Sequence, residues 1–474
     1  MNLYQRKHHP LNLFYTHISS HPRSSLFVLF LWIPLLIIYA TRNFTLCFPN
    51  CTAVVSHSPP QNGAVSPTKD LCPSGKVYVY NLPPKFNTDL LLTKCAESNP
   101  AKWLCGNVPN HGHGAPATEL RRILPENLSK SWYRTNQFAL ELIFHHRILN
   151  HKCRTMEPGS ATAFYIPFYA GVAVGEYLWT DDTSKRDRHC EMLVQWVKNQ
   201  KPWKRSNGSD HFMTIGRITW DFRRLTVEDK KWGSIFLNMP EMQNVTRFII
   251  EKDPGDAHEL TVPYPTGFHP TTKNTLDQWQ IFARDHNRSS LFTFTGSRRK
   301  WVPHDFRAFL LGYCQSEPGS CRLVDCDKAH CATNSTAVLE AFLGSEFCLQ
   351  PKGDSFTRRS VFDCMLAGSV PVFFWNQTAY DQYEWFLPGE PESYSVFIDN
   401  ELVRNGSGVI KQVLMKYSKE EIRRKREKVI ETIPRIVYGM GNGELITGFK
   451  DAFDIAFDGV LERIRQEKEW PDLL

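Results

Sequence analysis

The chain has 474 residues, of which 42% are hydrophobic and 22% are charged, and its formal net charge is +7. This length is enough for about two globular domains with a substantial core. The first acidic residue is Asp70, so part of the basic excess belongs to the N-terminal segment. The other Lys and Arg residues are interspersed with acidic ones and form no recognisable nucleic-acid module, which argues against a nucleic-acid-binding protein.

An uncharged apolar run of fifteen residues, Leu26–Ala40, lies near the N-terminus, and its uncharged neighbours extend it towards the length of a membrane span. Arg6, Lys7 and Arg23 precede the run, so the positive-inside rule keeps the N-terminus in the cytoplasm. A cleaved signal peptide is the alternative, but no small-x-small cleavage site follows the run. We therefore predict a type II topology with a cytoplasmic tail at 1–24 and a transmembrane signal anchor at 25–41.

The residues beyond the predicted anchor have the features of a luminal protein. Residues 42–74 are rich in Pro, Ser, Asn and Thr and lack periodicity, which is typical of a flexible stem. All thirteen cysteines follow the anchor, and we expect them to pair in an oxidising lumen, with at least one left free because the number is odd. Nine N-x-S/T sequons are candidate glycosylation sites: Asn43, Asn50, Asn127, Asn207, Asn244, Asn287, Asn334, Asn376 and Asn405.

The next stretch, 75–272, is predicted to be an N-terminal α/β domain. The pattern predicts strands at 76–81 and 163–168 and an amphipathic helix at 135–149. Three prolines between residues 262 and 270 indicate an extended connector, and we place the domain boundary after it.

Residues 210–224 are the most informative part of this domain. A strand from His211 to Ile215 is expected to end at Gly216, and an aromatic residue, a carboxylate and two guanidinium groups follow it. This combination is what a sugar-binding cleft uses, since a flat apolar face packs on the ring and charged groups bond its hydroxyls. A strand end stabilised by an Asp–Arg pair is the alternative. The residues concerned are Arg217, Trp220, Asp221 and Arg223.

The second domain is predicted at 273–474. Its first strand, 291–295, is followed by Gly296 and by Arg298, Arg299 and Lys300. Cations at the carboxyl end of such a strand suit phosphate binding in an open α/β sheet, although a solvated basic loop has the same composition.

Four cysteines then lie within eighteen residues: Cys314, Cys321, Cys326 and Cys331. Their spacing lacks a C-x2-C knuckle, so two local disulfides are favoured over a zinc site. Asp325 and Asp327 flank one of these cysteines and spell D-x-D, a pattern that can bind manganese, which we interpret as a chance match.

Residues 346–374 predict a strand, a polar loop, a helix and a buried strand. The loop contains Lys352, Gly353 and Asp354, and the helix is expected to begin with Ser355 as its N-cap and to end near Leu366. Cys364 lies on the apolar stripe of this helix, and we predict that it is a free cysteine.

Two arginines, Arg358 and Arg359, fall in the first turn of the predicted helix, where a cation opposes the macrodipole by roughly 0.3–1 kcal/mol. Asp354 and Asp363 could compensate their charge, but a bound diphosphate would be attracted by the arginines, Lys352 and the helix N-terminus together. We favour the diphosphate, with Asp363 accepting from ribose hydroxyls. The unit has neither a Walker A motif nor a GxGxxG fingerprint, which argues against a P-loop NTPase and a nicotinamide enzyme.

The segment FCLQPKGDSFTRRSVFDCMLAGSVPVFF resembles the nucleotide-sugar motif of the exostosin-type glycosyltransferases (glycosyltransferase family 47), and in particular the plant xyloglucan galactosyltransferase branch. KVYVYNLPPKFN and residues 210–224 extend the resemblance, which covers roughly residues 76–457. It implies the GT-B fold, in which two doubly wound Rossmann-like domains enclose a cleft. The N-terminal domain would bind the acceptor, and the C-terminal domain would bind the nucleotide sugar.

The resemblance also implies an inverting transfer that needs no metal cofactor, with a general base that takes the proton of the acceptor hydroxyl. Asp221 and His211 are our candidates for this base, and Trp220, Arg217 and Arg223 for acceptor binding. The predicted donor-binding residues are Arg298, Arg299, Lys352, Gly353, Asp354, Ser355, Arg358, Arg359 and Asp363.

The expected reaction is transfer of galactose from UDP-galactose to xylosyl side chains of xyloglucan in the Golgi lumen. UDP-galacturonic acid, UDP-xylose and UDP-arabinose are alternative donors, and a membrane-anchored polysaccharide-binding protein without catalytic activity is the alternative function. Complexes with other Golgi glycosyltransferases are a further expectation of the resemblance.

Overall fold

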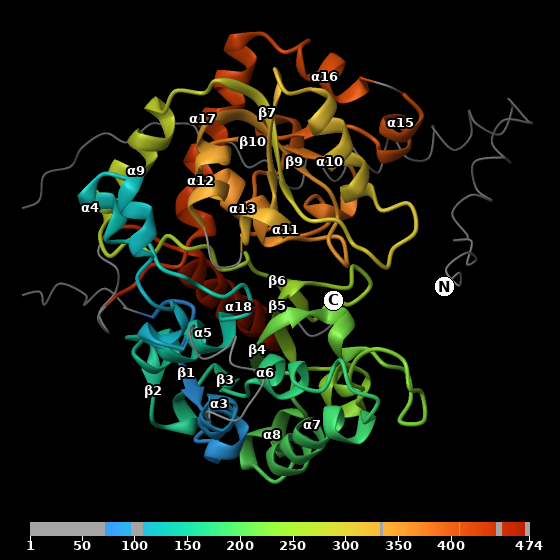
Figure 1. Cartoon of the computed structure of the whole chain (residues 1–474). Coiled ribbons are helices and arrows are strands. Elements are labelled where there is room, and N and C mark those ends of the chain that lie inside the picture. Colours follow the sequence, from blue (N-terminus) through green and yellow to red (C-terminus); the bar gives the residue numbers. More distant parts are fainter. Residues whose placement is uncertain (1–71, 96–107, 332–334, 407, 442–447, 470–474) are drawn as a thin grey trace, which may run out of the picture. The chain divides into compact units, whose positions relative to one another are not determined.

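The computed structural model describes residues 72–95, 108–331, 335–406, 408–441 and 448–469 (Figure 1). The chain divides into two units, Met1–Thr68 and Lys69–Leu474, and all of the described residues belong to the second. None of the helices formed by these residues has the length and apolar composition that crossing a bilayer requires. The predicted anchor and most of the predicted stem lie outside the described residues.

The first sheet has six parallel strands in the order β2-β1-β3-β4-β5-β6. Alternate residues of a strand face opposite sides of a sheet, so a strand that is apolar throughout is covered on both faces. In β3, Ala163 and Tyr165 belong to one core cluster, whereas Phe164 and Ile166 belong to another. The strands are β1 (Val77–Val79), β2 (Arg154–Thr155), β3 (Ala163–Ile166), β4 (His211–Ile218), β5 (Thr246–Glu251) and β6 (Glu259–Thr261).

Helices from this half of the chain cover the two faces of the first sheet. The face with Ala163 and Tyr165 packs against α5, and the face with Phe164 and Ile166 packs against α6 and α7. The helices are α3 (Thr88–Cys95), α4 (Glu126–Ser129), α5 (Leu140–Leu149), α6 (Ala170–Gly175), α7 (Thr183–Val197) and α8 (Lys201–Ser206).

The second sheet has five parallel strands in the order β11-β10-β9-β7-β8 (Figure 1, yellow to orange). In β9, Phe347 and Leu349 pack in the cluster that contains α10, whereas Cys348 packs in the cluster that contains α9, α12 and α17. The strands are β7 (Ser290–Gly296), β8 (Cys321–Asp325), β9 (Ser345–Gln350), β10 (Val370–Phe373) and β11 (Val396–Phe397).

The helices of this half are α9 (Lys273–Asp285), α10 (Phe306–Ser316), α11 (Cys326–Ala329), α12 (Ser335–Leu343), α13 (Arg359–Leu366), α14 (Pro391–Tyr394), α15 (Asn400–Asn405), α16 (Val409–Leu414), α17 (Lys419–Ile436) and α18 (Ala452–Glu469). The predicted boundary at residue 272 immediately precedes α9. The last helix, α18, nevertheless packs in the same core cluster as α5 and the first sheet. Arg147 of α5 binds Asp451 at 2.6 Å and Asp454 at 3.0 Å, which fixes the start of α18 there.

The two sheets have the same topology. In each, the chain forms one strand, places the second on one side of it, and adds the later strands on the other side. The order reverses between β1 and β3 in the first sheet and between β7 and β9 in the second. Ligands of open α/β sheets bind outside the carboxyl ends of the strands at such switch points. The prediction of an α/β protein with two parallel sheets is confirmed.

The helix predicted to begin at Ser355 begins at Arg359 instead, and Ser355 is not its N-cap. The reason is a carboxylate from the other sheet. Glu251, the last residue of β5, accepts hydrogen bonds from the backbone N–H groups of Phe356 and Thr357 and from the hydroxyl of Ser355. These groups are therefore held in an extended loop, and Arg358 takes the N-cap position with φ −152° and ψ 145°.

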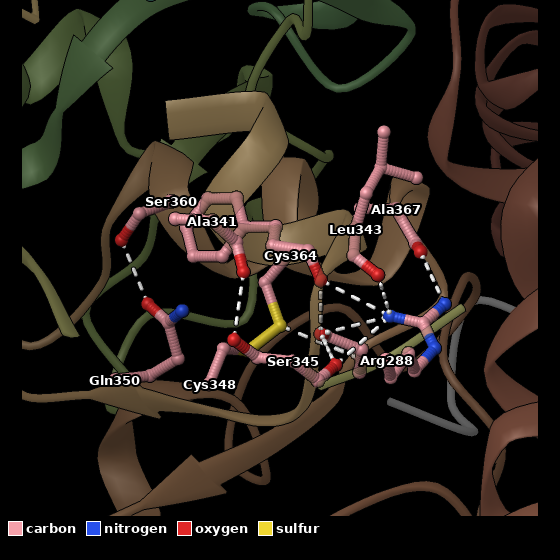
Figure 2. Close-up of a disulfide and its surroundings, with 11 residues drawn as sticks. Arg288, Ala341, Leu343, Ser345, Cys348, Gln350, Ser360, Cys364 and Ala367 are labelled. Atoms are coloured by element: carbon pink, nitrogen blue, oxygen red, sulfur yellow. Dashed lines mark hydrogen bonds between the residues drawn. A yellow bond between two sulfur atoms is a disulfide. The ribbon is translucent and has the colours of Figure 1, made fainter. Parts of the chain in front are cut away.

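The prediction that Cys364 is free is wrong, because Cys364 forms a disulfide with Cys348 (Figure 2). The two cysteines lie on the packed faces of α13 and β9, with their Cα atoms 6.4 Å apart. Figure 2 shows Arg288 beside them, donating to the carbonyl oxygens of Leu343 at 2.9 Å and Ala367 at 2.8 Å. Strand, helix and disulfide thus form one fixed unit behind the polar loop.

The other cysteine predictions can be compared with the described residues. The two local disulfides are confirmed as Cys314–Cys321 and Cys326–Cys331. Cys72 pairs with Cys153 across 81 residues of sequence. The free cysteine in the described part of the chain is Cys190, which is buried. In the D-x-D segment, Asp325 caps α11 by accepting from the N–H of Asp327 at 3.1 Å.

We predict that replacing Cys348 and Cys364 together by alanine lowers the free energy of unfolding by about 3 kcal/mol, because the disulfide closes a loop with a sequence separation of 16. Urea unfolding under oxidising conditions measures the loss. The matched control replaces Cys326 and Cys331, whose separation is 5, and should cost about 2 kcal/mol. An equal or smaller loss for the first pair would contradict the prediction.

Candidate functional site

Two loops meet at the carboxyl edge of the second sheet, at its switch point. One follows β7 and contains residues 297–300, and the other follows β9 and contains residues 351–358. Arg299 Nη1 donates to the carbonyl oxygen of Gly353 at 2.7 Å, and Arg307 Nε donates to that of Lys352 at 3.4 Å. The structure therefore brings together the two basic segments that the sequence singled out separately.

The carboxylate of Asp305 holds the first of these loops in place through hydrogen bonds. It caps α10 by accepting from the N–H groups of Arg307 and Ala308, and it also accepts from Arg299 Nε at 3.0 Å and from the Arg299 N–H at 2.7 Å. The chain after β7 thus returns to the start of α10, and the Arg299 guanidinium lies against the β9 loop.

The Arg358 guanidinium lies at the same place. Its Nη2 donates to the carbonyl oxygen of Thr295 at 3.4 Å, and its buried Nη1 has no hydrogen-bond partner among the described residues. Burial, followed by the nearby charges of Arg307 and Arg299, lowers the pKa of Arg358 to about 9. A buried cation without a hydrogen-bonded anion is costly, so this position is suited to an anionic ligand.

Lys352 adds a fourth cation. Its ammonium lies 5.1 Å from the ring centre of Trp375 and 5.5 Å from that of Phe356. Burial, Arg299 and Arg404 together lower its pKa. Asp354 is a further carboxylate beside these cations in addition to Asp305, but its side chain is 88% exposed and lies 4.0 Å from both Arg299 and Arg307. We call Arg299, Arg307, Lys352 and Arg358 the cation group.

Gly353 allows the loop to pass close to its neighbours. A Cβ atom here would lie 3.0 Å from the carbonyl oxygen of Thr357 and 3.1 Å from Arg358 Cγ. A side chain at this position would require the loop or Arg358 to shift by a few tenths of an ångström.

Arg307 was missed by the sequence analysis. It lies in the first turn of α10, where its charge opposes the macrodipole. Opposition to the macrodipole singled out Arg358 and Arg359 in the sequence, and the same criterion would have identified Arg307.

Arg359 and Asp363 are placed differently from the cation group. Arg359 Nε binds Asp363 at 3.1 Å, and its Nη1 donates to the carbonyl oxygen of Thr135. Burial raises the pKa of Asp363, and the charge of Arg359 opposes that rise. The guanidinium of Arg359 and the carboxylate of Asp363 are thus bonded within the protein. The role of these two residues in binding the nucleotide sugar stays a prediction.

Arg298 lies on the solvent side of the β7 loop. With Lys300 and His304 it lines an open pocket of about 510 Å³ that also borders Arg299 and Asp305. The pocket is continuous with the cation group through Arg299.

Glu251 joins this site to the first sheet. Besides the loop residues described above, its carboxylate accepts from the hydroxyl of Thr357 at 2.6 Å and from Trp220 Nε1 at 3.0 Å. Its side chain is buried, and it accepts five hydrogen bonds from donor groups of four residues. The sequence analysis did not identify Glu251, because a lone glutamate at a strand end carries no local pattern.

The predicted acceptor residues lie at the carboxyl end of β4, which runs to Ile218 and not to Gly216 as expected, so Arg217 belongs to the strand, and Trp220 and Arg223 follow it. Trp220 is 36% exposed and is held by Glu251. Asp221 is buried, and it accepts from Arg217 Nε at 2.6 Å and from Trp232 Nε1 at 2.7 Å.

Arg223 is bound on the side of β6. Its Nη2 lies 2.6 Å from carboxylate oxygens of both Asp256 and Glu259, and its Nε donates to Thr219 at 2.6 Å. The Asp–Arg pairing that the sequence left open is therefore present for Arg217 and Arg223, while Trp220 remains accessible.

His211 is the first residue of β4, at the amino end of the strand, and it is fully buried. Its Nδ1 lies 2.8 Å from Asp210, and its Nε2 lies 2.8 Å from the hydroxyl of Tyr80. Burial lowers its pKa, against the raising effect of Asp210. The structure does not bring His211 to the carboxyl edge where the other predicted site residues gather.

The chain was compared with protein families and with known proteins. The model of the exostosin GT47 domain matches residues 71–414. Xyloglucan galactosyltransferase XLT2 of Arabidopsis thaliana is 54% identical over 84% of this chain and 77% of its own length. Xyloglucan-specific galacturonosyltransferase 1 of the same plant is 39% identical over 83% of this chain and 58% of its own length.

Among solved structures, an alpha-glucosyltransferase in complex with UDP matches 63% of this chain and 80% of its own chain, with 11% identity and a TM-score of 0.32. This similarity is too low to support a conclusion about function. The family match and the relatives are sufficient by themselves: the chain belongs to the exostosin family of glycosyltransferases, GT47, and is a glycosyltransferase.

Proposed function

We propose that this enzyme transfers galactose from UDP-galactose to xylosyl side chains of xyloglucan. The observation that carries the proposal is the cation group at the switch point of the second sheet, where the buried Nη1 of Arg358 has no hydrogen-bond partner among the residues that the structure describes. Three guanidinium groups and an ammonium there are complementary to a diphosphate. Similarity to a relative named as a xyloglucan galactosyltransferase supports the sugar and the acceptor.

We further propose a GT-B arrangement with inversion at the anomeric carbon. The acceptor oxygen forms a bond to that carbon as the bond to the diphosphate breaks, and a base takes the acceptor proton. The cation group balances the charge of the departing UDP. Of the two candidate bases, Asp221 follows the carboxyl end of β4 beside Trp220, whereas His211 lies at the other end of the strand. We therefore prefer Asp221.

The test is incubation of residues 69–474, secreted from a eukaryotic host, with UDP-sugars and xylosylated xyloglucan oligosaccharides, read by mass spectrometry. We expect a mass gain of one hexose with UDP-galactose. A gain only with UDP-galacturonic acid would favour the activity named for the second relative, and UDP-xylose and UDP-arabinose complete the panel. Binding of the oligosaccharide without transfer from any donor would instead support a polysaccharide-binding protein.

We predict that Arg358→Ala weakens UDP binding about ten- to a hundredfold, because one charge-assisted contact contributes about 1.5–3 kcal/mol. Removal of this charge should not lower the melting temperature of the ligand-free protein, since the buried Nη1 of Arg358 has no hydrogen-bond partner in the described part of the chain. Calorimetry and thermal unfolding on one preparation measure both quantities.

Arg359→Ala is the matched comparison. An equal loss of UDP affinity would assign Arg359 to the donor site, as the family resemblance implies. A lower melting temperature with unchanged UDP affinity would assign it to the ion pair with Asp363.

We predict that Glu251→Gln lowers UDP affinity about tenfold. A glutamine offers one acceptor oxygen and one amide nitrogen, so the donors that face the nitrogen lose their acceptor and the β9 loop shifts. The control is Glu259→Gln, another buried carboxylate, which binds Thr219 and Arg223. The control should lose stability and keep its UDP affinity, and equal UDP affinities in the two variants would refute the role of Glu251.

We propose that transfer needs no metal ion, because side chains can balance the charge of the diphosphate. The initial rate should therefore be unchanged within about twofold when EDTA is added. Activity that disappears in EDTA and returns with manganese would contradict this, and Asp325 would then be the first residue to replace.

We propose a type II protein of the Golgi membrane with a luminal catalytic part. The charges around Leu26–Ala40 support it, as do the four disulfides between described residues and the exposure of five sequon asparagines: Asn127, Asn207, Asn287, Asn376 and Asn405. Asn244 is half-buried, whereas Asn43, Asn50 and Asn334 lie outside the described residues. Endoglycosidase treatment should increase the gel mobility of the expressed protein, and a C-terminus open to cytosolic protease without such a shift would refute the topology.

A further inference from the structure

We propose that Trp179 and Trp232 form a second carbohydrate surface, which binds acceptor sugars beyond the one that reacts. The two rings lie 4.6 Å apart between centres at an interplanar angle of 71°. Trp179 is 82% exposed and Trp232 is 40% exposed, which is unusual for side chains of this size. The inference rests on the proposed function for the identity of the ligand.

The loops that carry these rings are held by one buried arginine. Arg186 of α7 donates from Nε to the carbonyl oxygen of Tyr177 at 3.0 Å and from Nη1 to that of Lys231 at 2.8 Å. It also binds the carbonyl oxygen of Thr180. One cation thus fixes residues on both sides of Trp179 and the residue before Trp232. A surface whose loops are fixed in advance loses little freedom when a ligand binds.

The pair is continuous with the acceptor side of the site. Trp232 Nε1 donates to Asp221 at 2.7 Å, so one edge of the indole is fixed. Asp221 follows Trp220 in the chain, and Trp220 Nε1 donates to Glu251, which also binds the β9 loop. Trp179, Trp232 and Trp220 therefore mark a path from the surface to the donor loop. We call these three residues the tryptophan path.

The chemistry of the path suits a saccharide chain. A pyranose ring has a flat face of C–H groups and a rim of hydroxyls, which matches an indole face beside polar groups. Leu225 and Val227 are 74% and 57% exposed nearby in sequence, and a protein partner would use such aliphatic residues as well. We commit to the saccharide because the path ends at the site of transfer, and a polymeric acceptor must extend beyond its reacting sugar.

The experiment uses Trp179→Ala, with Trp179→Phe as the conservative variant and Met415→Ala as the control. Met415 is 65% exposed and follows α16 in the second half of the chain. Retention in gels that contain xyloglucan polymer, without donor, measures acceptor binding. Initial rates give KM for the polymer, for a short xylosylated oligosaccharide and for the UDP-sugar.

We expect Trp179→Ala to weaken retention and to raise KM for the polymer about tenfold, with kcat and the KM of the UDP-sugar unchanged. The short oligosaccharide should be used equally well by all variants, and phenylalanine should restore most of the polymer affinity. Normal transfer to polymer by Trp179→Ala would overturn the inference and leave the proposed function intact. Retention that depends on Trp179 without any transfer would support the surface and refute the proposed reaction.

Sedimentation of the same variants tests the remaining alternative, in which a second copy of the chain binds the tryptophan pair. A change of oligomeric state in Trp179→Ala, with unchanged retention by xyloglucan, would identify the pair as a contact between copies of the chain and overturn the inference. A wild-type protein that neither binds xyloglucan nor transfers sugar to it would refute both proposals.

Discussion

The buried carboxylate of Glu251 is the interaction on which the arrangement of the site depends. It lies at the carboxyl end of β5 and accepts from Trp220 on one side and from the loop after β9 on the other. Because this carboxylate accepts from the N–H groups of residues 356 and 357, α13 begins only at Arg359, and Arg358 takes the N-cap position. The carboxylate of Glu251 therefore positions both the indole of Trp220 in the first half of the site and the guanidinium of Arg358 in the second. Neither sheet could form this geometry without the other.

The cation group has the opposite electrostatic character. Burial lowers the pKa of Arg358 most, and the positive charges of Arg307 and Arg299 lower it further. The ligand-free protein therefore holds cations that repel one another. Such an arrangement reduces stability until an anion binds, and the relief of repulsion then adds to the affinity for that anion. Because Asp354 is exposed at the edge of the group, it can leave the guanidinium groups without disturbing the core. The site thus combines a rigid carboxylate support with cations that are incompletely neutralised.

Sequence patterns identified several of the strands and helices but not the contacts between them, and β5, which carries Glu251, was not predicted. An apolar strand such as 370–374 was predictable because strands that are covered on both faces are apolar throughout. The start of α13 was not predictable, because the groups that shift it are bonded by Glu251, 104 residues away in sequence from Ser355. Cys364 looked like an ordinary apolar residue of its helix, and its pairing depends on how that helix packs on β9. Local motifs located the polar loop, whereas its conformation is a tertiary property.

The disulfide between Cys72 and Cys153 has a mechanical consequence. Cys72 precedes β1, and Cys153 precedes β2, so the bond joins the chain to the amino ends of two neighbouring strands. The carbonyl oxygen of Cys153 also accepts from the N–H of Val77 at 3.0 Å. Tension applied to the residues before Cys72 would pass through the sulfur atoms into this edge, and β1 would not be peeled from its neighbours. Trp220 and Asp221, which follow the carboxyl end of β4, lie at the opposite end of the sheet from this bond.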